Sequence, residues 1–220
     1  MSGGVVVPSS AYSTFKANVE QVDRLLDAYD KTKGTDRGKR GLDHFTRAAL
    51  LFLCSSWEVY IEQVTNEAGK IITERISQPS QLPNPVKKKS ASIIKNASNL
   101  LTPITFADDW KAFYMEQINV YTTGLNTPKK QKILDLFQHY LGIAENRILS
   151  DVPELTKIDE IVTVRGQIAH NVFAETYLKK NTVDGYCTTI HEAVKGIEIL
   201  LWNYLPEITN GKRPWQNTYT

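Results

Sequence analysis

Apolar side chains recur every three or four residues along most of this 220-residue chain, and that spacing constrains its fold more than any other feature. In the first such segment, one helix face is marked by Phe15, Val19, Val22, Leu25, Leu26 and Tyr29. Comparable segments follow over residues 42–76, 84–100, 107–123, 128–141, 156–171 and 181–206. We find neither an alternating strand pattern nor an internal repeat. The sequence therefore predicts an all-α fold, an up-and-down bundle of about five to seven helices.

The helices are expected to form one domain over residues 13–206, between a flexible N-terminal tail (1–12) and a C-terminal tail (207–220). In the segment 42–76, the residues up to Cys54 are apolar on nearly every side, which predicts a central helix packed by neighbours on several faces. Thr156 followed by Asp159 resembles a capping box at the head of the helix over 156–171.

Composition narrows the function classes. Hydrophobic residues make up 41% and charged residues 23%, which excludes a disordered or low-complexity chain. Lys and Arg number 26 against 24 Asp and Glu, for a net charge of +2, so contact with nucleic acid would need a local patch. The two cysteines, Cys54 and Cys187, predict buried thiols in a reducing compartment.

Neither a metal site nor a membrane anchor is predicted. Cys and His do not cluster at the spacing of metal ligands, so we expect no cofactor. The longest apolar run, residues 48–54, is far shorter than the ~20 residues that cross a bilayer, and the N-terminus lacks the pattern of a signal peptide. A soluble cytoplasmic protein is the expectation.

One charged residue does not fit the core pattern of the helix over 156–171. Its apolar stripe consists of Ile158, Ile161, Val162, Ile168, Ala169 and Val172. At about 100° per residue, Arg165 lies near the middle of that stripe, where an unpaired charge costs several kcal/mol. Arg165 therefore needs a buried acidic partner, a protein interface or a phosphate.

His170 follows five residues later, near the C-terminal end of the same helix. Arginine can hold a phosphate through two hydrogen bonds, and histidine can move a proton near neutral pH. Together the two side chains are sufficient for cleaving a phosphodiester that carries its own nucleophile, the 2′-hydroxyl of RNA.

The stretch Val164-Arg-Gly-Gln-Ile-Ala-His-Asn171 resembles the Arg-x4-His motif of the HEPN superfamily, helical proteins that are often metal-independent ribonucleases. Two further patches resemble the RiboL-PSP-type branch of that superfamily. They are the central-helix sequence Arg47-Ala-Ala-Leu-Leu-Phe-Leu-Cys-Ser-Ser-Trp-Glu-Val-Tyr-Ile-Glu62, and Leu136-Phe137 with Leu141-Gly142-Ile143. The three patches stand in the order expected of that branch.

The resemblance implies a homodimer in which Arg165 and His170 of both protomers line one cleft. By motif match, Arg165 would hold the phosphate and His170 would be the acid/base group, with Gly166 and Asn171 in supporting positions. Gly166 replaces a polar residue that many members have directly after the arginine. Val172 replaces the tyrosine found in members whose antitoxin is a nucleotidyltransferase, so modification of that tyrosine is not carried over.

Two further residues are candidate supports for Arg165. Glu58 lies in a mostly apolar helical row, so we expect its carboxylate to be paired, with Arg165 as the best candidate partner. Glycine inside a helix costs about 1 kcal/mol against alanine, so Gly166 calls for a close approach. That approach is made by a partner helix, by an RNA phosphate, or by a helix crossing within the monomer.

The predicted function is metal-independent endoribonuclease activity through attack of the 2′-hydroxyl, in a defence or toxin–antitoxin setting with an RNA substrate and an antitoxin or operon partner protein. The alternative is a dimeric HEPN interaction module without catalysis. Candidate RNA-backbone contacts are Lys87, Lys88, Lys89, Lys129 and Lys130. The remaining histidines, His44, His139 and His191, have no spacing that suggests a metal site.

Overall fold

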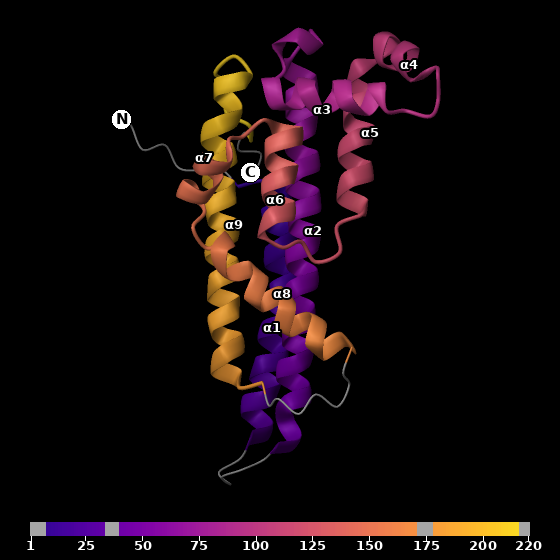
Figure 1. The fold of residues 1–220 in the computed structure, drawn as a ribbon. Helices are drawn as coiled ribbons and strands as arrows, with labels where there is room; N and C mark the ends of the chain where they lie inside the picture. Colours follow the sequence, from indigo (N-terminus) through magenta and orange to yellow (C-terminus); the bar gives the residue numbers. More distant parts are fainter. Residues whose placement is uncertain (1–7, 34–39, 171–177, 216–220) are drawn as a thin grey trace.

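The computed structural model of this protein describes residues 8–33, 40–170 and 178–215, and these residues form helices and connecting turns without a strand (Figure 1). The α-helices are α1 (Ser10–Lys33), α2 (Asp43–Arg75), α3 (Asn84–Lys95), α4 (Thr102–Asp108), α5 (Trp110–Thr123), α6 (Lys130–Leu136), α7 (Glu145–Asp151), α8 (Leu155–His170) and α9 (Lys180–Ile208). The shorter elements are η1 (Arg40–Leu42), η2 (Pro79–Gln81) and the π-helical turn η3 (Phe137–Leu141). The all-α expectation is confirmed.

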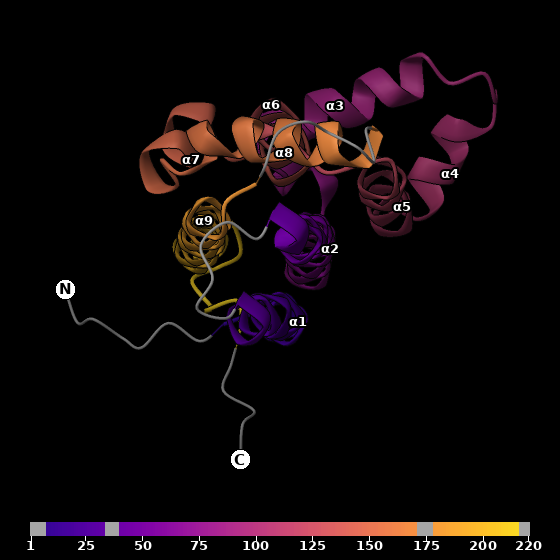
Figure 2. The ribbon, with the colours of Figure 1, turned by 90° about the horizontal axis from the view of Figure 1, so that it is seen from below.

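Helix α2 is the centre of the bundle, as its apolar sequence predicts. Its buried side chains include Trp57, Tyr60 and Ile72, and they contact neighbours along nearly the whole helix. Viewed from below, α1 lies on one side of α2 and α9, and α8 crosses the opposite side (Figure 2). This arrangement leaves the outer surface of α8 uncovered by any other described helix.

Two helices in the described residues were not expected from the sequence, α4 and α7. Both have seven residues, too few for apolar periodicity to distinguish them from a loop. Pro103 lies in the first turn of α4, where a backbone N–H would have no partner within the helix, so proline's missing N–H costs no hydrogen bond. Before α7 the chain turns at Gly142 (φ 85°), where a Cβ would collide with Pro83.

The first turn of α1 begins at Ser10, two residues before the end of the expected N-terminal tail, and is held by two carboxylates from other helices. Ser9 donates its N–H and hydroxyl to Glu198 of α9, at 2.8 and 2.7 Å, and Tyr60 donates its hydroxyl to the same carboxylate at 2.8 Å. Glu67 of α2 accepts from the N–H of Ala11 at 2.7 Å. These carboxylates bind N–H groups that a helix start leaves without partners.

The C-terminal residues also pack on the bundle beyond the expected boundary. Helix α9 continues past Pro206 to Ile208. Arg75 at the end of α2 donates to the carbonyls of Lys212 and Arg213, at 2.6 and 2.8 Å. The part of the domain with defined contacts therefore extends past residue 206.

The capping box expected at the head of α8 is not formed. Thr156 donates its hydroxyl to the carbonyl of Pro153, and Asp159 accepts instead from the backbone N–H of Lys130 at 2.7 Å. Asp159 thus caps the first turn of α6, a different helix. The sequence pattern was right about the residue type that a helix start needs and wrong about which helix uses it.

Candidate functional site

Helix α8 positions Arg165 through the apolar stripe that anchors the helix to the bundle. Ile158 and Ile161 are fully buried against it, and one and two turns later Arg165 and Ile168 are half-buried. Ala169, expected in the stripe, is exposed. The stripe therefore loosens toward the C-terminal end of α8, so that Arg165 lies where the helix passes from the core to the surface.

The Arg165 side chain lies against the middle of α2, close enough to influence Cys54. Burial raises the pKa of the Cys54 thiol to about 12, the Arg165 charge opposes that rise, and Glu58 adds to it. The Nε of Arg165 is buried and has no hydrogen-bond partner among the described residues. A buried N–H without an acceptor is costly, and the described residues supply no acceptor for this one.

Glu58 is not the ion-pair partner of Arg165, contrary to our expectation. In the part of the chain that the structure describes, no ion pair joins them. The carboxylate of Glu58 instead accepts from the backbone N–H and, at 3.1 Å, the hydroxyl of Thr127. Thr127 is buried with φ 44°, a conformation that non-glycine residues rarely adopt, so Glu58 stabilises a strained turn.

Two more side chains hold the same turn, which precedes α6. Trp57 of α2 donates its indole N–H to the carbonyl of Pro128 at 3.2 Å, and Asp159 of α8 binds the N–H of Lys130. Sequence reasoning did not find this triple clamp, because its members are 29 to 71 residues apart from the turn they bind. The clamp ties α2 and α8 to the turn that precedes α6.

His170 is the last residue of α8, five positions after Arg165 on the same helix. The side chain of His170, and the whole of Asn171 and Val172, lie outside the described residues. The structure therefore places the backbone of the Arg-x4-His motif at the C-terminal end of α8.

Gly166 makes no close approach within the described part of the chain. A Cβ built on it would meet no atom within 4 Å. A helix crossing among the described residues is therefore not the reason for this glycine. A partner helix or an RNA phosphate beside Arg165 would each have to approach from the open side of α8.

The candidate RNA-contacting lysines form two groups. Lys87, Lys88 and Lys89 lie on α3, where Lys87 donates to the carbonyl of Ser80 at 3.0 Å and Lys89 lies over the ring of Tyr140. Lys129 precedes α6 and is exposed, and Lys130 is half-buried at its first turn. Lys129 and Lys130 lie on the turn that Glu58 of α2 and Asp159 of α8 bind, so this second group is linked by hydrogen bonds to the helix that carries the motif.

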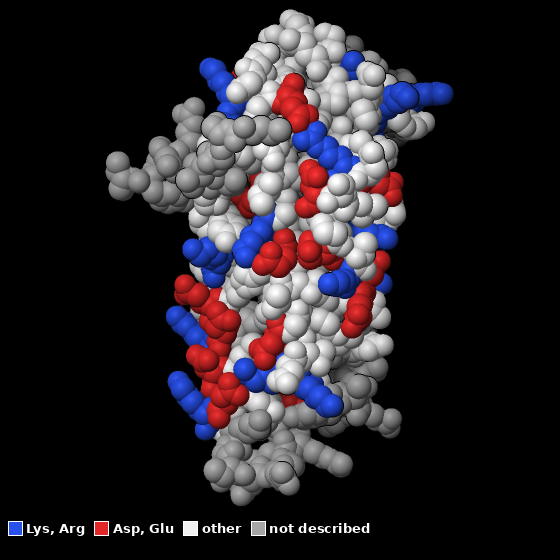
Figure 3. All heavy atoms as spheres, turned by 90° about the vertical axis from the view of Figure 1, so that its left-hand side faces the viewer, with Lys and Arg blue, Asp and Glu red and all other residues white. Residues whose placement is uncertain are grey.

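Charge on the α9 side of the molecule is mixed. Figure 3 shows basic and acidic side chains interleaved there, with acidic ones gathered toward one edge. Lys180 at the start of α9 is paired with Asp30 of α1 at 3.2 Å and with Asp184 at 3.5 Å. An RNA backbone would meet repulsion as well as attraction on this face.

The other histidines contact backbone carbonyls or lie half-buried, and the described residues contain neither a metal-ligand cluster nor a membrane-spanning helix. The Nδ1 atoms of His44 and His191 contact the carbonyls of Gly41 and Cys187, both at 2.9 Å, and His139 is half-buried in η3. Over residues 8–33, 40–170 and 178–215, we find no group of three or more potential metal ligands. Within the same ranges, every helix is too short or too polar to span a bilayer.

These features define a class of protein: an all-α domain in which a helix ending in Arg-x4-His crosses a long buried central helix, the arrangement of the HEPN superfamily. The family model for RiboL-PSP-HEPN matches residues 16–203, and the chain belongs to that family. No curated protein and no solved structure matches the chain. HEPN proteins are often ribonucleases, so an RNA- or nucleotide-directed function is the one to examine.

Proposed function

We propose that this protein is a metal-independent endoribonuclease in which Arg165 holds the scissile phosphate and His170 transfers protons. The observation that carries the proposal is the state of Arg165, which is half-buried on the family's motif helix with a buried Nε that lacks a partner among the described residues. A charge in such a position is costly unless an anion pairs with it. A phosphate bound there would supply that anion.

The chemistry needs no group beyond RNA and these side chains. One His170 accepts the proton of the 2′-hydroxyl, and the 2′-oxygen forms a bond to the adjacent phosphorus. The bond from phosphorus to the 5′-oxygen breaks, and a second imidazolium gives that oxygen a proton. The products are a 2′,3′-cyclic phosphate and a 5′-hydroxyl. Arg165 stabilises the charge that builds on the phosphoryl oxygens.

A homodimer supplies the second imidazole. The uncovered outer surface of α8, with open space around the Cα of Gly166, fits the approach of a second copy about a two-fold axis. Light scattering at micromolar concentration should give about twice the chain mass of 24.9 kDa. A monomer at that concentration would remove the two-histidine mechanism.

The direct test is cleavage of RNA by the purified protein in the presence of EDTA. We expect products that end in a 2′,3′-cyclic phosphate, and no cleavage where the nucleotide before the scissile bond is 2′-deoxy. His170→Ala should abolish cleavage and leave the helical circular-dichroism signal nearly unchanged. The matched control is His139→Ala, which removes a half-buried histidine from η3 and should cleave like the wild type.

Cleavage that survives His170→Ala, or that requires a divalent metal, would contradict the proposal. A dimer that binds RNA or protein without cutting RNA would support the alternative, a non-catalytic HEPN module. These outcomes differ in products and not only in rate, so one experiment separates them.

We further propose that the protein acts in the cytoplasm in a defence or toxin–antitoxin setting, with an antitoxin or operon partner protein that restrains it. An RNA-cleaving HEPN protein would harm its own cell unless it were inhibited or waiting for a trigger. Induced expression should therefore arrest growth for the wild type and not for His170→Ala. Equal growth of both strains would contradict this setting while leaving the chemistry to the cleavage assay.

A further inference from the structure

A small hollow lies between the end of α5 and the helical turns that follow it. Its volume is about 320 Å³, and it is lined by Val120, Tyr121, Gly124, Leu125, Lys132 and Tyr140. Small-molecule sites range from about 300 to 1,000 Å³, so this hollow lies at the small end of that range and has room for a flat ring.

The hollow has an aromatic wall that is held in place. The rings of Tyr121 and Tyr140 lie 5.0 Å apart between centroids, tilted by 45°. Tyr140 is buried, whereas Tyr121 is half-buried and keeps surface toward the hollow. The hydroxyl of Tyr121 donates to the carbonyl of Lys132 at 3.4 Å, which joins α5 to α6. A fixed tyrosine ring is a suitable surface for stacking an unpaired base.

Two lysine side chains lie near these tyrosine rings. Lys132 lines the hollow, and the Nζ of Lys89 lies 5.7 Å from the centroid of the Tyr140 ring. The nearby carboxylate, Asp135, accepts a hydrogen bond from the side chain of Gln131 at 3.0 Å. An apolar peptide side chain could contact the rings but would leave both lysines without an anion. A nucleotide uses both features, with its base on the ring and its phosphates beside the lysines.

The hollow is connected to the proposed catalytic arginine through one turn. Gly124 lines the hollow, and Thr127, three residues later and hence at most about 10 Å away, is bound by Glu58 of α2. Glu58 lies one helical turn from Cys54, and the charge of Arg165 is close enough to Cys54 to lower the pKa of its thiol. Figure 1 shows this turn at the level of α8, to which Asp159 attaches it.

We infer that this hollow is a base-binding subsite for single-stranded RNA, in which one unpaired base stacks on Tyr121 while Lys89 and Lys132 contact the flanking phosphates. The inference rests on the proposed ribonuclease function for the identity of its ligand. Stacking on a tyrosine tolerates every base, so the subsite selects single strands over duplexes and has little sequence preference.

The test is binding of a fluorescein-labelled single-stranded RNA, measured by anisotropy with His170→Ala protein so that the RNA stays intact. Tyr121→Leu should raise Kd by about 5- to 140-fold, the contribution of one stacked base. Tyr121→Phe keeps the ring and should bind nearly as well as its parent. Lys132→Gln should weaken binding and lower the slope of log Kd against log salt by about 0.7.

Three further variants distinguish a lost binding site from a misfolded protein. Val120 is 65% exposed on the rim of the hollow, so Val120→Glu adds a negative charge without loss of packing, and Val120→Gln is its neutral counterpart. We expect weaker binding from Val120→Glu alone. Tyr12→Leu is the matched control for Tyr121, because Tyr12 is likewise a half-buried tyrosine on a helix, α1, but does not line the hollow. Tyr12→Leu should leave Kd unchanged.

The inference is overturned if single-stranded RNA does not bind, if Tyr121→Leu and Val120→Glu bind like their parent, or if duplex RNA shows the same losses. The failure of the proposed function looks different. Wild-type protein that never cleaves RNA but binds it through Tyr121 would leave the subsite standing. If the wild-type protein cleaves RNA and Tyr121→Leu cleaves it with the same KM, the ribonuclease function is supported and the subsite is not.

Discussion

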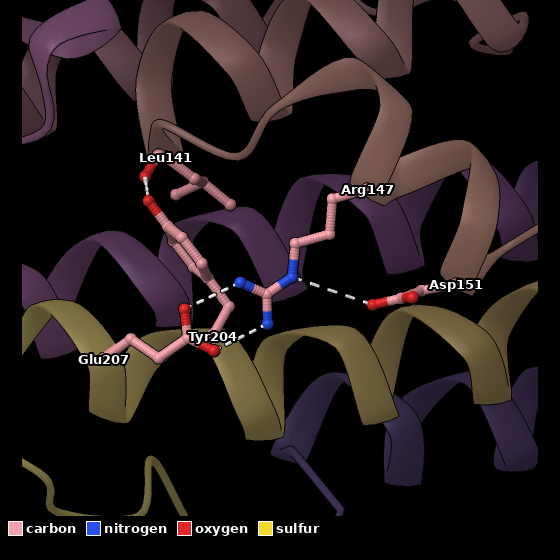
Figure 4. A network of polar contacts seen from close by, with 5 residues as sticks. All are labelled: Leu141, Arg147, Asp151, Tyr204 and Glu207. Atoms are coloured by element: carbon pink, nitrogen blue, oxygen red, sulfur yellow. Dashed lines mark hydrogen bonds and ion pairs between the residues drawn. The ribbon is translucent and has the colours of Figure 1, made fainter.

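Two arginines on consecutive helices have opposite surroundings. Arg147 of α7 makes two hydrogen bonds of 2.7 Å to Glu207, lies 3.8 Å from Asp151, and has its guanidinium 5.3 Å from the centre of the Tyr204 ring (Figure 4). Arg165 of α8 has no ion pair within the described residues, and its Nε is buried without a partner.

The difference separates an arginine that is paired within the described residues from one whose buried Nε has no partner among them. Glu207 raises the pKa of Arg147, and Arg147 lowers the pKa of Glu207, so each charge stabilises the other. Tyr204 in turn donates to the carbonyl of Leu141 at 2.9 Å, which links the pair to η3. Arg147 thus joins α7 to α9, whereas Arg165 joins nothing that the structure describes.

Exchanging the two arginines for alanine should give the largest contrast. We expect Arg165→Ala to lower kcat/KM for RNA about 10²–10³-fold, as loss of a charge-stabilising donor does. Arg165→Lys keeps the charge but loses the planar fork, so its activity should also be low. Arg147→Ala should leave kcat/KM nearly unchanged and lower the free energy of unfolding by about 1 kcal/mol. Kinetics and urea unfolding measure both, and equal kinetic losses would contradict the contrast.

The acidic neighbours of the two arginines should also behave differently. Glu58→Ala leaves the N–H of Thr127 without its acceptor and should cost about 1–3 kcal/mol of stability. Glu58→Gln keeps one acceptor oxygen and should cost less. A double-mutant cycle of Glu58 with Arg165 should nevertheless show coupling near zero, whereas Arg147 with Glu207 should couple by about 0.5–1 kcal/mol. Coupling above about 1 kcal/mol between Glu58 and Arg165 would show that they form a pair.

Gly166 tests whether the open side of α8 is used. Because its Cβ would meet nothing, Gly166→Ala should raise the free energy of unfolding by about 0.5–1 kcal/mol through helix propensity. The same change should lower RNA cleavage, since it places a methyl group beside Arg165 on the surface proposed for RNA or the second copy. The control is Gly142→Ala after η3, which should destabilise the protein because residue 142 has φ 85° and its Cβ would collide with the Cβ of Pro83. A Gly166→Ala enzyme that is stabilised and fully active would remove the close approach.

The smallest effect is expected from the thiol beside Arg165. Burial raises the pKa of both Cys54 and Cys187 to about 12, so at pH 8 the two thiols are protonated and poorly nucleophilic. Iodoacetamide should label neither cysteine in the folded protein and both after unfolding in guanidinium chloride. Rapid labelling of Cys54 alone in the folded state would show that the packing between α2 and α8 opens.

Much of the fold could be predicted from the sequence, because long helices repeat their apolar face several times. Helix α2 was expected over residues 42–76 and spans Asp43–Arg75. Helices α4 and α7 could not be predicted, since seven residues hold only two turns of pattern. The hollow beside Tyr121 could not be predicted either, because the residues that line it come from separate elements, including α5, α6 and η3.

The sequence by itself determined the long helices, the position of Arg165 and His170 at the end of one of them, and the family to which that motif belongs, because these properties depend on residues close together in the chain. Only the tertiary structure decided the partners of the carboxylates. Glu58 binds Thr127, 69 residues away, and Asp159 binds Lys130, 29 residues away. A carboxylate is satisfied by whichever donor packing brings within about 3 Å, and packing follows the whole chain, not local spacing.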